Sequence, residues 1–112
     1  MKVTVTKNHP GEGQFPSFKK GTDVNMVKEE CNDFKGWYPC EIAGHKTYIP
    51  GIFVKDGKLT RDYDPTELVQ ETGDVLHVQE IVYACLFAKN ESEKTGWIPA
   101  ESVISFGLEP SV

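Results

Sequence analysis

The sequence lacks a paired set of cysteines, a long apolar run and an excess of positive charge. Three cysteines in 112 residues leave an odd thiol, a pattern that favours a reducing cytoplasm over secretion. No apolar run approaches the roughly 20 residues that a membrane-spanning helix needs. Met1 and Lys2 are followed by the alternating segment 3–6 rather than by the apolar core of a signal peptide. We therefore expect a cytoplasmic protein without membrane contact.

Positive charge is scarce, with 12 Lys and Arg against 17 Asp and Glu and a formal net charge of −5. A nucleic-acid-binding protein normally presents a basic face, and the short basic groups of this chain are diluted by acids. No nucleic-acid ligand is therefore expected. An acidic surface instead favours basic or neutral partners through electrostatic steering.

Helical periodicity is also missing, because no stretch of ten residues repeats its apolar positions at helical spacing. Short alternating segments separated by turn-forming residues are frequent, and this pattern is typical of small β-barrels or sandwiches. The predicted strands include residues 3–6, 23–27, 37–42, 46–49 and 81–88, and residues 90–94 are predicted to form a charged hairpin loop. The sequence therefore predicts an all-β fold.

One short phrase occurs twice in the chain. Residues 47–54 read TYIPGIFV and residues 96–103 read GWIPAESV, so that an aromatic residue, Ile, Pro and a final Val recur at an offset of 49. Such self-similarity predicts a unit of about fifty residues used twice. The proline in each copy predicts a single 3₁₀ turn directly after it. The Asp56-Gly57 turn signal lies midway and predicts two domains, residues 1–56 and 57–112.

These residues resemble the SH3 family. In the first copy, Gly36-Trp37-Tyr38 is similar to the aromatic pair of that family, and residues 48–54 are similar to its closing motif, with Phe53 where Tyr is usual. In the second copy, Asp62-Tyr63-Asp64-Pro65 resembles the opening Ala-Leu-Tyr-Asp-Tyr element. The resemblance covers roughly residues 3–105. It implies two small SH3-like β-barrels in tandem. Because two cores of this size would each be marginal, we expect the barrels to be packed on each other.

SH3 domains bind proline-rich peptides in a shallow groove lined by aromatic side chains. The resemblance implies a ligand that is an extended peptide or protein segment with basic residues. The binding residues that it implies are Trp37, Pro50 and Phe53 as an apolar platform, Glu29, Glu30 and Asp33 for charge selection, and Tyr63, Trp97 and Pro99 in the second copy. Neither copy holds a complete groove, because the first lacks the opening tyrosines and the second has Ser102 at the position of the final aromatic.

The first expectation is thus a non-catalytic adaptor that binds peptides or proteins. A second is a structural scaffold, or an oligomer subunit, in which the two grooves bury each other. A third is a bacterial cell-wall-binding module, which would require export.

Catalysis is not expected, and neither is a metal or other cofactor. The spacing of Cys31, Cys40 and His45 matches no common zinc pattern. Cys85 lies in an apolar run, where burial would suppress ionisation of its thiol.

Overall fold

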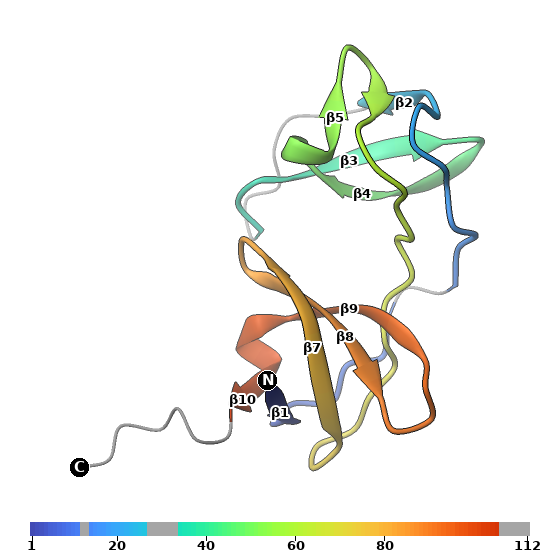
Figure 1. Cartoon of the computed structure of the whole chain (residues 1–112). Coiled ribbons are helices and arrows are strands. Elements are labelled where there is room, and N and C mark those ends of the chain that lie inside the picture. The colour runs from blue at the N-terminus through green and yellow to red at the C-terminus, as the bar shows by residue number, and fades with distance from the viewer. Residues whose placement is uncertain (12–13, 27–33, 106–112) are drawn as a thin grey trace. The chain divides into compact units, whose positions relative to one another are not determined.

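The computed structural model describes residues 1–11, 14–26 and 34–105, and the regular elements of these residues are β-strands and two 3₁₀ helices (Figure 1). No α-helix occurs in this part of the chain. The all-β prediction is therefore confirmed. The strands are β1 Lys2–Val5, β2 Val24–Met26, β3 Trp37–Ile42, β4 His45–Pro50, β5 Val54–Lys55, β6 Lys58–Leu59, β7 Val75–Val82, β8 Cys85–Asn90, β9 Thr95–Pro99 and β10 Val103–Ser105.

The strands form three antiparallel sheets, and among the described residues none of the sheets closes into a barrel. The largest sheet has the order β10-β1-β7-β8-β9, a second has the order β2-β3-β4, and β5 pairs with β6 alone. Figure 1 shows β7, β8 and β9 as successive neighbours of one meander. All pairings within the sheets are between antiparallel strands, which short turns can join.

The duplicated phrase has the same local structure in both copies. The 3₁₀ helices η1 (Gly51–Phe53) and η2 (Ala100–Ser102) directly follow Pro50 and Pro99. The two prolines have nearly equal backbone angles, φ −63° and ψ 131° for the first and φ −61° and ψ 138° for the second. Proline suits this position because its fixed φ fits both the end of a strand and the start of a helical turn. The predicted 3₁₀ turns are confirmed.

The chain folds into two compact units. Unit 1 consists of Met1–Gly13 together with Thr66–Val112, and unit 2 is Gln14–Pro65. These units do not coincide with the expected halves 1–56 and 57–112. The Asp56-Gly57 turn, expected as the boundary between domains, lies inside unit 2 and joins β5 to β6.

In unit 1, β1 is a central strand of the five-stranded sheet. Thr4 pairs with Ile104 of β10 on one side and with Val75 of β7 on the other. Its neighbours Val3 and Val5 point into the core, and each keeps only 1% of its surface exposed. The core cluster of this unit comprises Val3, Val5, Leu68, Leu76, Leu86, Ala88 and Ile98.

In unit 2, the segment 58–63 takes the corresponding central place. Its first residues pair with β5 through Val54–Leu59 and Lys55–Lys58. On the other side it pairs with the segment that leads into β2, because Leu59 N–H donates to Thr22 O at 2.9 Å and Tyr63 N–H donates to Phe18 O at 2.8 Å. Unit 2 therefore has the order β5, residues 58–63, residues 18–26, β3 and β4.

Comparison of the two units shows that the repeats have exchanged their first strands. In the sequence repeat, β3, β4, η1 and β5 of the first copy correspond to β8, β9, η2 and β10 of the second. Yet β1, which opens the first copy, pairs with β7 and β10 of the second. Conversely β6, which opens the second copy, pairs with β5 of the first. Each sheet is thus completed by the other copy's first strand.

The short link between the copies explains this exchange. Asp56 (φ 53°) and Gly57 (φ 74°) are the two residues between β5 and β6, and both have positive φ, as a type I′ hairpin turn requires. A strand that begins directly after such a turn must fold back on the strand before it. Because β6 pairs with β5 in unit 2, the equivalent position in unit 1, between β7 and β10, is occupied by β1.

One predicted strand is wrong in its bounds. Residues 81–88 are not one strand, because a turn at Tyr83 and Ala84 divides them between β7 and β8. No glycine marks this turn in the sequence. Tyr83 itself adopts the left-handed conformation, with φ 53°, which is uncommon for a bulky residue.

Candidate functional site

The residues predicted to form a peptide groove in the first copy lie in unit 2. Trp37 begins β3 and pairs with Pro50 at the end of β4. Phe53 closes η1, and the ring of Tyr63 lies 5.6 Å from its ring at an interplanar angle of 71°. The sequence places Tyr63 in the second copy. In the structure its segment belongs to unit 2, where its ring contacts Phe53 of the first copy. The structure therefore assembles these four residues in one unit.

All four of these side chains are buried. Trp37 retains 6% of its surface, Phe53 and Tyr63 retain 3% each, and Pro50 is almost fully enclosed. The Tyr63 hydroxyl donates a 2.5 Å hydrogen bond to the backbone oxygen of Tyr48. A buried aromatic residue normally needs such a partner for its polar end. These residues therefore serve the packing of unit 2 and present no open aromatic platform.

Arg61 is a neighbour of this cluster that the sequence reasoning did not single out. Its guanidinium carbon lies 4.5 Å from the centre of the Phe53 ring, although the residue itself is exposed. Such a cation–π contact contributes about 0.5–1 kcal/mol at an exposed site. Strand periodicity gives no signal for this contact, because Arg61 lies in the bend after β6 and not on a strand.

The acidic residues expected to select a basic ligand cannot be placed beside this cluster. Glu29, Glu30 and Asp33 lie outside the described residues. Charge selection by these three side chains therefore stays a prediction.

In unit 1, Trp97 is a packing residue of β9. It is 5% exposed, and its ring lies 5.1 Å from that of Phe87 on the neighbouring strand. Its backbone is also paired, since its N–H donates to Thr66 O at 2.9 Å and its carbonyl accepts from Leu68 N–H at 3.0 Å. Pro99, at the end of the same strand, is half-buried. Trp97 and Pro99 lie in unit 1, whereas Tyr63, predicted beside them, lies in unit 2.

The described cysteines are unsuited to nucleophilic chemistry. Burial raises the pKa of the Cys40 thiol from 9.0 to about 12, so that the thiol stays protonated at neutral pH. Cys85 is likewise buried. Within residues 1–11, 14–26 and 34–105, no three His, Cys, Asp or Glu side chains group closely enough to hold a metal ion.

His9 ties together two segments of unit 1. Its backbone exchanges two hydrogen bonds with Gln70, of 2.8 and 2.9 Å. Its ring nitrogen Nδ1 lies 2.6 Å from Leu68 O, and Nε2 lies 3.3 Å from the Glu67 carboxylate. Both nitrogens thus face acceptors, and an imidazolium could donate to each. This arrangement holds a loop in place.

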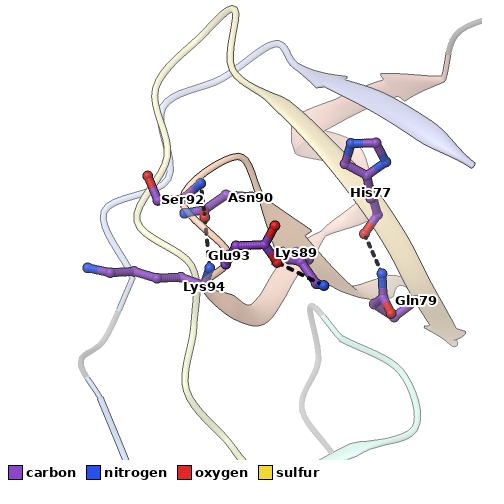
Figure 2. Close-up of polar contacts among 7 residues, drawn as sticks. All are labelled: His77, Gln79, Lys89, Asn90, Ser92, Glu93 and Lys94. Carbon is purple, nitrogen blue, oxygen red and sulfur yellow. Dashed lines mark hydrogen bonds and ion pairs between the residues drawn. The ribbon is translucent and has the colours of Figure 1, made fainter.

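The predicted hairpin loop at residues 90–94 is confirmed, and it joins β8 to β9. The side chain of Asn90 organises this loop. Figure 2 shows the Asn90 side chain turned into the loop, where its oxygen accepts the backbone N–H groups of Ser92 and Lys94 at 2.9 Å. Lys89 and Glu93 form an ion pair of 3.0 Å beside it. These contacts are local and shape the turn, so they do not form a binding site.

Comparison with family models, curated proteins and solved structures gave no match for the chain. In the part of the chain that the structure describes, no helix is both long and apolar enough to cross a membrane. Any proposal about function therefore rests on the residues and their geometry.

Proposed function

We propose that this chain is a non-catalytic structural module made of two SH3-like repeats, acting as a scaffold or as a subunit of an assembly. The observation that carries the proposal is the burial of the aromatic residues that would line an SH3 peptide groove. Trp37 and Phe53, the best candidates for ligand contact, retain 6% and 3% of their surfaces. A receptor for proline-rich peptides must instead present such rings to the ligand.

The strand order supports the SH3-like assignment. In unit 1 the first strand lies between the last and the second, in the order β10-β1-β7-β8-β9. Unit 2 repeats this order with the segment 58–63 in the place of β1. Both units also place a 3₁₀ turn before the last strand. A five-stranded antiparallel arrangement of this order agrees with the sequence resemblance, although fold alone does not assign function.

An adaptor function would need a surface other than the four aromatic and proline side chains of unit 2. Binding to a bacterial cell wall stays a prediction that no observation favours.

Fluorescence quenching tests the proposal directly. The variants Trp37→Phe and Trp97→Phe each leave a single tryptophan to report, and iodide should quench both folded variants several-fold less than the same chains in urea. A titration of the intact protein with basic proline-rich peptides should leave the indole N–H resonance of Trp37 unmoved. Strong quenching of the Trp37 indole in the folded protein, or a saturable shift of its resonance, would overturn the scaffold in favour of the adaptor.

A further inference from the structure

Unit 1 depends on a strand that its own remaining chain does not supply. β1 is separated from Thr66–Val112 by the whole of unit 2. It nevertheless contributes Val3 and Val5 to the core cluster and pairs with strands on both sides. β1 contains no cysteine, so no disulfide fixes it. Sheet hydrogen bonds and core packing are what hold β1 in unit 1.

We propose that β1 is a transferable strand, and that two copies of this chain can exchange it so that β1 of one copy lies between β7 and β10 of the other. This inference does not rest on the proposed function. It identifies the gap between β7 and β10 as an acceptor site whose partner is a second copy of the chain.

The intramolecular exchange already shows that a first strand can complete a sheet of the other repeat. β1 leaves its own copy and pairs with the second, while β6 makes the reverse move. An exchange between chains would preserve the same contacts, such as Val3 with Leu76 and Val5 with Val103. Pairing of β1 within its own chain and pairing with a second chain therefore differ in entropy, because only the first requires the loop within one chain to close.

The acceptor site fits β1 in particular. The alternating Val3 and Val5 fill fully enclosed core positions, whereas Lys2, on the opposite face, is exposed. On one edge Val5 N–H donates to Asp74 O and Val5 O accepts from Gly73 N–H, both at 2.8 Å. A strand without two apolar side chains in this register would leave cavities in the core. The sequence of β1 itself therefore favours a second copy as the occupant.

Concentration decides between the two arrangements. Within one chain, the local concentration of a tethered strand is on the order of millimolar. Exchange between chains should therefore be a minor outcome when the protein refolds at micromolar concentration. It should increase roughly in proportion to concentration below the millimolar range.

Disulfide trapping during refolding tests the proposal. One chain carries Lys2→Cys and the other His77→Cys, with the native cysteines replaced by alanine or serine in both. Lys2 and His77 are opposite one another and both are exposed. They form a non-hydrogen-bonded pair, because the adjacent position is bonded through Val78 N–H and Met1 O at 2.8 Å, and such pairs approach closely enough for a disulfide.

The equimolar mixture is unfolded in denaturant, refolded at about 10 and about 100 µM, and oxidised. We expect disulfide-linked pairs of unlike chains, with a linked fraction that rises roughly tenfold between the two concentrations. The doubly substituted chain K2C/H77C should form the bond within one chain at the lower concentration, which checks the register.

A control for linkage between chains that do not exchange strands mixes chains with Lys55→Cys and Lys58→Cys. These residues face each other across the two-residue turn of unit 2, so they should not link different chains at either concentration. A Lys2–His77 linked fraction no greater than this control overturns the proposal. Failure of the doubly substituted chain to form its internal bond would overturn it as well, because the acceptor register would then be wrong.

Discussion

At the scale of single residues, aromatic side chains predicted to contact a ligand are instead buried in the protein. Phe53 and Tyr63 lie in different sequence repeats, yet their rings meet in unit 2 with 3% of each surface exposed. The sequence predicts both residues as ligand contacts. It could not show whether they face a ligand or a core, because aromatic side chains are common in both settings.

Two substitutions of Tyr63 separate the contributions of its ring and its hydroxyl. Tyr63→Phe removes the hydrogen bond to Tyr48 O and should reduce the free energy of unfolding by about 1 kcal/mol. Tyr63→Ala also empties the contact with Phe53 and should cost about 3–5 kcal/mol. Urea denaturation measures both. Tyr83→Phe, at an exposed turn position, is the matched control and should leave stability unchanged. Equal effects at the two tyrosines would contradict the assigned role of Tyr63.

At the scale of elements, local signals predicted much of the fold. Alternating apolar residues located β1, β2, β3 and β4, and the prolines located both 3₁₀ turns. Pairing between distant strands left no such signal, because the alternation in β1 shows which side chains are buried and not which sheet buries them. The sequence does contain the Asp56-Gly57 turn signal. The two-residue length of this turn indicates a hairpin between β5 and β6 rather than a boundary between domains.

Strand content predicts which fragments fold. Residues 14–65 contain every strand of unit 2 and should give dispersed amide resonances and a cooperative urea transition. Residues 57–112, the expected second domain, lack β1 and would leave Leu76 and Ile104 without the central strand beside them. That fragment should remain unfolded. A folded 57–112 fragment would mean that β6 can replace β1 in unit 1.

At the scale of the whole molecule, β1 pairs within unit 1 and β6 pairs within unit 2, although the sequence repeat assigns each of these strands to the other copy. Unit 1 cannot be completed until the chain has passed through unit 2, because β1 precedes unit 2 and β7 follows it. The exchange therefore makes the fold of unit 1 depend on contacts distant in sequence. Such contacts form more slowly than local ones, since a long loop must close first.

The central claim is that β1 pairs with β7 and that β6 pairs with β5. Nuclear Overhauser effects between α-protons test it most directly, because α-protons of non-hydrogen-bonded antiparallel pairs lie close together. We predict strong effects between Lys2 and His77 and between Val54 and Leu59, the latter pair lying beside the 2.8 Å bond from Thr60 N–H to Phe53 O. Effects from β1 to β5, together with effects from β6 to β10, would show that each repeat keeps its own first strand and would contradict the account.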